Sequence, residues 1–174
     1  VFKKKIKSIV IGLGNIGMMY DIKNLKNKNF YTHSKSIKFS KFFDLMAGVD
    51  SSKKKIKLFR EKYQLPAFTD PVLGLKNTSA EMVVIATNED SHLKIVKKIS
   101  KFKSIKYVVL EKPGGLNYQE LKLMFQICEK NNVKLFLNYF RMYDSYYFNK
   151  IRRHLSNNSI EIIANYKRGV KNNC

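Results

Sequence analysis

Residues 5–20, K-I-K-S-I-V-I-G-L-G-N-I-G-M-M-Y, decide the fold. The apolar run that ends at Ile11 predicts a short buried strand, and Gly12, Gly14 and Gly17 follow it with the spacing G-x-G-x-x-G. In this spacing the first glycine permits a sharp turn, the second lets the backbone approach a pyrophosphate, and the third lets the next helix pack on the strand. The N-terminus of such a helix directs free N–H groups at the phosphates. The stretch predicts a dinucleotide-binding turn, although glycine-rich turns also occur as plain strand-to-helix connections.

Length and composition limit the class of protein. A chain of 174 residues has room for one α/β domain and little more. Its two cysteines, Cys128 and Cys174, form no close pair, which argues against a disulfide framework or a metal site. No apolar run reaches the length of a membrane span, and the first residues do not resemble a signal peptide. We therefore expect a cytoplasmic protein with no membrane contact.

The net charge of +21 raises the possibility of a nucleic-acid partner, because a basic surface attracts phosphate backbones without sequence recognition. The excess is mostly lysine spread along the whole chain, and arginine, which matches phosphates and base edges better, is scarce. Runs such as Lys53–Lys55 fall where a helix would present its solvated face. We expect no specific nucleic-acid partner, and a binder that uses its basic surface remains an alternative.

Strand-like and helix-like segments alternate after the glycine turn. The unbroken apolar run Met82–Ala86 is typical of a strand covered on both faces of a parallel sheet, and Tyr107–Leu110 repeats the pattern. A polar, asparagine-rich loop is expected over residues 21–30, where it interrupts the first crossover. The alternation predicts an α/β fold, a doubly wound parallel sheet of the Rossmann type. The other strands are expected at 42–49, 67–69, 133–137 and 160–166.

The expected helices show start signals and apolar faces. We place helix starts at Thr32, at Asp90 or Ser91, and at Asn117, because each of these residue types can cap a helix. Three of the helices have apolar residues at helical spacing. Those residues are Ile56, Phe59 and Tyr63; His92, Ile95, Val96 and Ile99; and Leu121, Met124, Phe125 and Cys128.

Polar residues and glycines follow the expected strands at one edge of the sheet. These segments are Gly12–Gly17, Asp50, Thr87–His92, Glu111–Pro113 and Asn138–Arg141. Open α/β sheets bind their ligands at the carboxyl ends of the strands. The five segments therefore predict one ligand site along that edge.

These segments resemble the successive motifs of the glucose-fructose oxidoreductase / myo-inositol dehydrogenase (Gfo/Idh/MocA) family of NAD(P)-dependent oxidoreductases. The motifs are G-L-G-N-I-G, G-V-D, Y-Q-L-P-A-F-T-D, V-V-I-A-T-N-E-D-S-H, V-L-E-K-P and N-Y-F-R-M-Y-D. The resemblance implies an NAD(P)-binding Rossmann domain over residues 1–150 and a sugar or sugar-nucleotide substrate. It also implies that the diphosphate lies on the turn formed by Gly12, Leu13, Gly14, Asn15, Ile16 and Gly17.

Asp50 is expected to select the cofactor. A carboxylate at the end of the second strand accepts hydrogen bonds from the adenosine ribose and repels a 2′-phosphate, so NAD is favoured over NADP. Its distance from Gly12 exceeds the usual interval of about 20 residues, which the insertion over residues 21–30 explains. An exposed turn aspartate is the alternative interpretation.

The resemblance implies further contacts around the nicotinamide. Thr87 and Asn88 would line the cofactor cleft, although the family usually has proline where Asn88 stands. His92 would either contact the cofactor or lie on a buried helix face. Glu111 would lie beside the nicotinamide ribose, with Asn138 and Arg141 flanking the ring.

Lys112 is the expected catalytic residue. In the family the matching lysine lies beside the nicotinamide and the sugar hydroxyl that is oxidised. Burial beside the positive ring of oxidised NAD would favour its neutral form, which suits a general acid/base. The alternative is a lysine that only closes a loop.

The end of the chain departs from the family pattern. Family members carry a second domain, often with an Asp-x-x-x-His pair, but His154 has Lys150 four residues before it. We expect residues 151–174 to be a linking helix and the first strand of a truncated substrate domain. The alternative to an enzyme is then a non-catalytic NAD-binding or regulatory remnant, and a full-length form could be a homo-oligomer.

Overall fold

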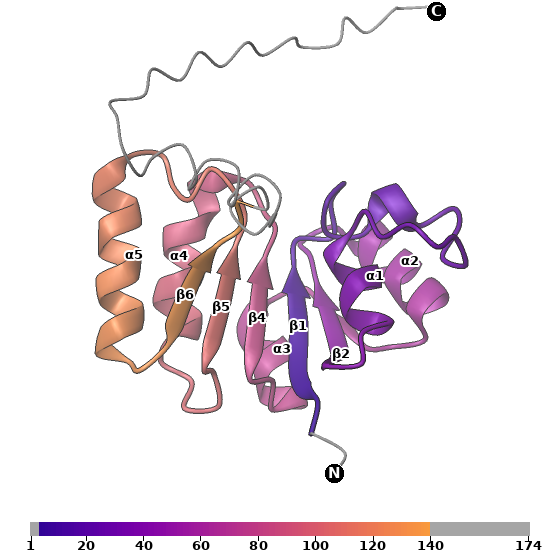
Figure 1. Cartoon of the computed structure of the whole chain (residues 1–174), viewed down its shortest axis with the longest axis horizontal. Coiled ribbons are helices and arrows are strands. Elements are labelled where there is room, and N and C mark those ends of the chain that lie inside the picture. Colours follow the sequence, from indigo (N-terminus) through magenta and orange to yellow (C-terminus); the bar gives the residue numbers. More distant parts are fainter. Residues whose placement is uncertain (1–3, 140–174) are drawn as a thin grey trace, which may run out of the picture. The chain divides into compact units, whose positions relative to one another are not determined.

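Six strands form a single parallel sheet in the computed structural model, which describes residues 4–139 (Figure 1). The strand order is β3-β2-β1-β4-β5-β6, which confirms the doubly wound parallel sheet. The first compact unit of the chain ends at Asn138. The strands are β1 (Ile6–Ile11), β2 (Phe43–Val49), β3 (Ala67–Phe68), β4 (Met82–Ile85), β5 (Tyr107–Leu110) and β6 (Lys134–Leu137).

Several expectations concern residues outside the described range. They are the domain boundary at 150, Arg141, the linking helix after 150 and the strand over 160–166. These stay predictions.

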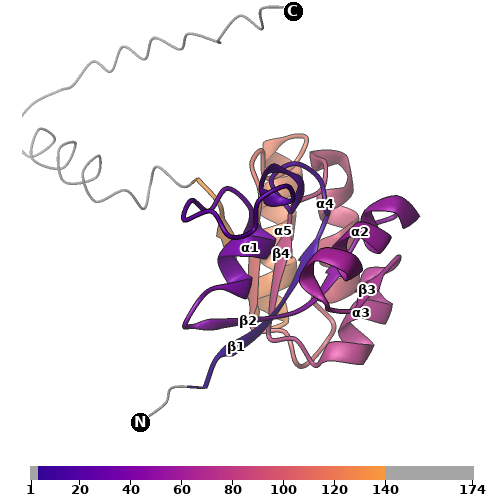
Figure 2. The same ribbon diagram turned by 90° about the vertical axis from the view of Figure 1, so that its right-hand side faces the viewer.

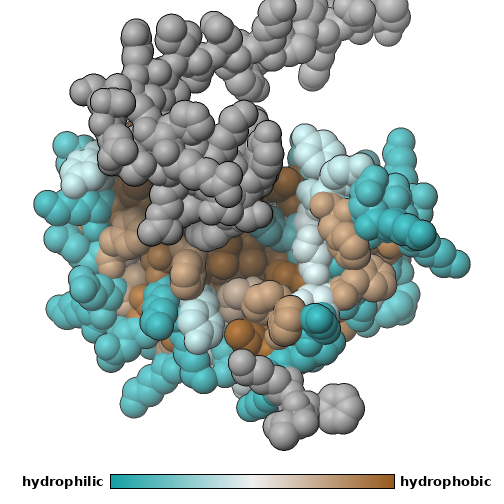
Figure 3. Space-filling model, viewed as in Figure 1, coloured by the Kyte–Doolittle hydropathy of each residue, from teal (hydrophilic) through white to brown (hydrophobic). Residues whose placement is uncertain are grey.

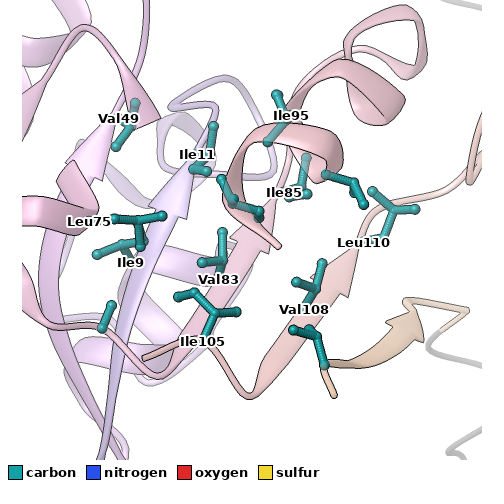
Figure 4. Packing of buried hydrophobic residues seen from close by; sticks show 14 of the residues in the cluster. Ile9, Ile11, Val49, Leu75, Val83, Ile85, Ile95, Ile105, Val108 and Leu110 are labelled. Carbon is teal, nitrogen blue, oxygen red and sulfur yellow. The ribbon is translucent and has the colours of Figure 1, made fainter. Parts of the chain in front are cut away.

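The helices cover the two faces of the sheet in separate groups (Figures 1 and 2). Helices α1 (His33–Lys38) and α2 (Lys53–Tyr63) pack on one face through Ile37, Ile56 and Phe59. On the other face lie α3 (Pro71–Thr78), α4 (Glu89–Ile99) and α5 (Tyr118–Lys130). Figure 4 shows the second core, in which Ile9, Ile11, Val83, Ile85, Val108 and Leu110 from the strands meet Leu75 and Ile95 from the helices.

Burial along the strands follows from this arrangement. All four residues of β4 are buried, because β4 lies in the centre of the sheet with apolar clusters on both faces, as its apolar run predicts. In β5, Val108 and Leu110 are buried but Tyr107 and Val109 are only half-buried. The expectation that β5 is covered on both faces is therefore wrong for the described chain. Neither α1 nor α2 reaches this part of the sheet, and apolar surface is visible over it in Figure 3.

The predicted helix starts hold at two positions and differ at a third. Thr32 Oγ1 accepts a hydrogen bond from Lys35 N, and Asn117 Oδ1 accepts one from Glu120 N. The N-cap of α4 is Asn88 instead of Asp90 or Ser91, because Glu89 and Asp90 already have helical backbone. On α5, Met124 and Cys128 supply the buried face, whereas Phe125 is 43% exposed. The predicted apolar face of this helix therefore wrongly includes Phe125.

The chain after the glycine turn differs most from expectation. The motif is followed by one turn and a 3-10 helix, η1 (Met19–Asp21), in place of a long helix. Asp21 is buried and binds Tyr31 N and Thr32 Oγ1, which ends the turn and brings the loop back to α1. None of the helices within residues 4–139 is both long and apolar enough to cross a membrane.

Candidate functional site

A cleft of about 390 Å³ opens at the carboxyl ends of β1, β2 and β4. It brings together five residues expected at the site from the sequence. These are Gly12, Gly14, Asp50, Thr87 and Asn88. Ser51, Lys55, Thr69, Ser91 and Lys94 complete much of its wall. The cleft thus lies at the edge where the sequence predicts the ligand.

The three glycines of the motif have different reasons to be glycine. Gly12 has a φ of +94°, and a Cβ there would lie 2.5 Å from the carbonyl oxygen of Ala86. A Cβ on Gly17 would fall on the carbonyl oxygen of Gly12. A Cβ on Gly14 would meet no atom within 4 Å. The fold itself requires the first and third glycines, whereas the second leaves open space beside the cleft.

Backbone donors surround that open space. Leu13 N donates to Asp50 Oδ2 at 2.8 Å, while the side chain of Leu13 is fully buried in the core. The N–H groups of Gly14, Asn15 and Ile16 find no acceptor among residues 4–139. Unpaired N–H groups at a glycine turn form an anion-binding concavity. Although the long helix is absent, one turn still supplies donors suited to a phosphate.

Asp50 fixes the local structure and also lines the cleft. Its carboxylate accepts hydrogen bonds from Leu13 N and from Ser52 N, each at 2.8 Å, and pairs with Lys55 Nζ at 3.3 Å. Its side chain is 8% exposed and lines the cleft. A carboxylate offers about four lone-pair sites, so acceptor capacity remains for a hydroxyl. The exposed turn aspartate of the alternative interpretation does not fit this burial.

His92 lies beneath the cleft and does not line it. The ring is fully buried, with Nε2 3.1 Å from Thr87 O and Nδ1 3.3 Å from Gly114 O. Both nitrogens therefore face main-chain carbonyls of the loops after β4 and β5. Of the two sequence interpretations, the structure favours the buried helix face. Thr87 itself accepts a hydrogen bond from Ser91 Oγ at 2.7 Å.

A second cluster surrounds Glu111 at the end of β5. Glu111 Oε1 is 2.7 Å from His33 Nε2 and accepts a hydrogen bond from Asn138 Nδ2 at 2.5 Å. Burial alone would raise the pKa of Glu111, but the hydrogen bonds from His33 and Asn138 outweigh it and hold the pKa below its ordinary value. At neutral pH Glu111 is thus an ionised, nearly buried carboxylate that contacts both His33 and Asn138.

Lys112 directly follows Glu111 in the chain. The peptide bond from Lys112 to Pro113 is cis, and the side chain of Lys112 is exposed. The burial that we expected around Lys112 is therefore not provided by residues 4–139. In the sheet order, β4 alone separates β1 from β5, so Lys112 and the glycine turn leave the same edge two strands apart.

Sequence reasoning missed two residues of these clusters. His33 directly follows Thr32, the predicted helix start, and Lys55 belongs to the lysine run expected on a solvated helix face. The signal for Lys55 is its position five residues after Asp50, in the first turn of α2. No local signal identified His33, because its partner is 78 positions away in the chain.

The site and fold together define a dinucleotide-binding domain. A Rossmann sheet, a glycine turn with free N–H groups and open space at Gly14, and a carboxylate at the end of β2 fit the diphosphate and ribose of a dinucleotide. A family model described as "Oxidoreductase family, NAD-binding Rossmann fold" matches residues 6–139. The chain belongs to this family, Gfo/Idh/MocA, which binds NAD.

Individual relatives agree with this assignment. A myo-inositol 2-dehydrogenase of Thermotoga maritima is 26% identical over 152 residues, which are 87% of this chain and 41% of that protein. The structure of a probable dehydrogenase from Thermotoga maritima matches with 26% identity and a TM-score of 0.69 over 85% of this chain and 40% of that one. The WlbA dehydrogenase of Bordetella pertussis, crystallised with NADH and UDP-GlcNAcA, shares the fold with 19% identity and a TM-score of 0.70, over 86% of this chain and 42% of that one.

The chain thus spans about two fifths of the length of these relatives. What it shares with them is the NAD-binding domain.

Proposed function

We propose that the chain binds NAD along the carboxyl edge of the sheet and is the cofactor-binding part of a dehydrogenase that acts on a sugar or sugar nucleotide. One observation carries the proposal: Gly14 has open space where the protein's own packing requires no glycine, beside backbone N–H groups that lack acceptors. Among the possible occupants of such a cradle, a diphosphate satisfies both features.

The substrate class rests on the relatives. The matched curated relative is named for oxidising myo-inositol, a cyclic polyol. The fold neighbour WlbA was crystallised with a sugar nucleotide. We therefore propose that the enzyme oxidises a secondary hydroxyl on a sugar-like ring. We also propose that it works in the cytoplasm.

We propose that different residues along the carboxyl edge of the sheet bind different parts of NAD and the substrate. Bound NAD supplies the hydride acceptor. The N–H groups of Gly14, Asn15 and Ile16 hold the diphosphate, and Asp50 accepts hydrogen bonds from the adenosine ribose. Lys112 Nζ is the proposed general base, which takes the proton of the substrate hydroxyl while the hydride passes from the substrate carbon to NAD. Thr87 and Asn88 line the cleft, and Asn138 and Arg141 are expected to flank the nicotinamide.

Titration of the chain with NADH and NADPH by calorimetry tests the proposal. We expect NADH to bind more tightly, because Asp50 would repel a 2′-phosphate. In Asp50→Asn the amide oxygen can still accept from Leu13 N, which keeps the contact with the glycine turn, whereas the bond from Ser52 N is lost. We expect NADH affinity to fall about tenfold, the effect of losing hydrogen bonds to a charged acceptor.

Two results would contradict the proposal in different ways. No heat with either nucleotide would remove the claim that the chain binds a dinucleotide. Tighter binding of NADPH would remove only the role of Asp50.

A non-catalytic NAD-binding remnant is the alternative favoured by the exposure of Lys112. Incubation with NAD and a panel of sugars and sugar nucleotides separates the two functions, since only an enzyme raises the absorbance of the reduced cofactor. A nucleic-acid binder would instead show tight DNA binding with a steep salt dependence.

A further inference from the structure

His33 links two parts of the edge that are far apart in the sequence. It is the first residue of α1, and its Nε2 atom lies 2.7 Å from Glu111 Oε1 at the end of β5. The His33 side chain is 17% exposed and that of Glu111 9%. The contact is therefore largely shielded from solvent, where a charge-assisted hydrogen bond is strong.

The backbone of the same residue is tied to the glycine turn. His33 N donates to Ile16 O at 3.0 Å, and Ser34 N donates to Gly17 O at 3.0 Å. The start of α1 is thus held by the carbonyls of the turn that carries the free N–H groups. The side chain of His33 extends from this fixed backbone to Glu111.

Glu111 in turn contacts the backbone of Lys112. Its Oε1 atom also accepts from Asn138 Nδ2 at 2.5 Å, and its Oε2 atom lies 3.4 Å from Lys112 N. The carboxylate therefore contacts the backbone that carries Lys112 and the strand end after β6. His33 and Asn138 hold it from opposite elements, α1 and the end of β6.

We propose that His33 is a positioning residue that sets the spacing between the diphosphate turn and the Glu111–Lys112 strand end, and hence the seat of the nicotinamide ring. This role rests on the proposed NAD site. His33 can fill this positioning role without touching the cofactor. The glycine turn fixes the diphosphate in the middle of the dinucleotide, and Glu111 and Lys112 receive its nicotinamide end. Within the described chain, His33 contacts both parts, the turn through its backbone and Glu111 through its side chain.

Two ligands that differ only in the nicotinamide test this role. NADH carries the ring and ADP-ribose lacks it, whereas both place a diphosphate on the glycine turn. We would measure the affinity of the chain for each by calorimetry. We expect His33→Ala to weaken NADH binding about tenfold, as for one lost hydrogen bond to a carboxylate. ADP-ribose affinity should change less than about twofold, because the backbone contacts of residue 33 remain.

Matched variants separate positioning from general damage. In His33→Gln an N–H lies at nearly the reach of Nε2 and should restore NADH affinity, whereas the shorter His33→Asn should behave like alanine. Asp50→Asn acts at the adenosine end and should weaken both ligands equally. The fluorescence of bound NADH gives a second reading, since emission from a displaced nicotinamide ring should move towards that of free NADH in His33→Ala and His33→Asn only.

The outcomes distinguish the positioning role of His33 from the NAD site itself. Equal weakening of NADH and ADP-ribose by His33→Asn, or no weakening of either, would overturn the positioning role. Failure of His33→Gln to restore NADH binding would do the same. If the unmodified chain bound neither ligand, the proposed NAD site would itself be wrong.

Discussion

Gly14 distinguishes a binding site from a packing requirement. At Gly12 and Gly17 an added methyl group would strike main-chain atoms, so these residues would be glycine in any protein with this turn. At Gly14 it would strike nothing within 4 Å. The motif read from the sequence cannot separate these reasons, because all three positions show the same letter. The structure separates them, because packing requires glycine at the first and third positions and leaves open space at the second.

Gly14→Ala should therefore lose binding without losing the fold. We expect a change in the free energy of unfolding within about 0.5 kcal/mol, as at most open positions. NADH affinity should fall at least about tenfold, because the methyl group occupies the space of the diphosphate. Urea unfolding and calorimetric titration of one preparation measure both quantities.

Gly12→Ala is the matched control, since it adds the same methyl group two residues away. There the positive φ alone costs about 1–3 kcal/mol, and contact with Ala86 O adds to that cost. We expect it to destabilise the fold clearly. Unchanged NADH binding by Gly14→Ala would show that the open space is not where the cofactor lies.

Sequence reasoning correctly predicted the positions of residues that directly follow a strand. Asp50 and Glu111 follow directly after β2 and β5, whose apolar runs predict strands, so their place at the edge could be predicted from local pattern. His33 could not, because its significance depends on a partner reached by tertiary contact. The buried state of His92 is a similar case, since a histidine at helical spacing fits a core face and a ligand equally well.

The asparagine-rich loop between η1 and α1 is organised around a buried lysine. Lys35 is fully buried, its Nζ is 3.6 Å from Asp21 Oδ1, and it donates to the carbonyls of Asn27 at 2.8 Å and Asn29 at 2.6 Å. The loop therefore wraps around a cation supplied by the next helix. A polar composition predicts only a surface loop, and this arrangement depends on one side chain that the pattern does not mark.

Lys35→Met should destabilise the domain strongly. It leaves the buried Asp21 carboxylate without its cation and removes the donor of three carbonyl hydrogen bonds, to Asn24, Asn27 and Asn29. Loss of one partner of a buried ion pair costs about 3–5 kcal/mol. Urea unfolding measures the cost, and hydrogen exchange at Tyr31 N should become faster as the loop opens.

Lys38→Met provides the comparison on the same helix. Lys38 is exposed, so its replacement should change the free energy of unfolding by less than about 0.5 kcal/mol. Equal stability of the Lys35 and Lys38 variants would show that the buried pair gives no net stabilisation.

Elements with an unbroken signal could be predicted well from the sequence. The strand β4 and the helix face of Ile56, Phe59 and Tyr63 occur where their apolar patterns place them. The prediction was wrong for β5, where the same apolar pattern has one half-buried face. A strand's own residues do not show whether a helix from elsewhere in the chain covers them.

At the scale of the whole molecule, charge governs how stability depends on pH. The chain carries 34 lysine and arginine residues against 13 acidic ones, so protonation of carboxylates in acid increases an already large positive charge. Self-repulsion then destabilises the compact state. Salt screens such long-range repulsion, with a Debye length of about 3 Å at 1 M. A contribution from a buried, hydrogen-bonded carboxylate is screened much less.

Glu111 should supply that salt-resistant contribution. Its pKa is lowered in the folded state, so it binds its proton less readily there than in the unfolded chain. The stabilisation is therefore fully present above the ordinary carboxyl pKa of about 4.3 and is lost as the pH falls through the folded-state value. In 1 M salt, urea midpoints of the unmodified chain should fall over this window, and Glu111→Gln should flatten the fall.

Glu81→Gln tests whether any carboxylate with a lowered pKa would do the same. The hydrogen bond from Lys106 lowers the pKa of Glu81, but this pair lies at the surface, where ion pairs contribute little in salt. We expect its acid profile to follow that of the unmodified chain. If Glu111→Gln also followed it, the His33–Glu111–Asn138 cluster would not stabilise the ionised carboxylate. The strand end at Lys112 would then lack the fixed anion on which its placement depends.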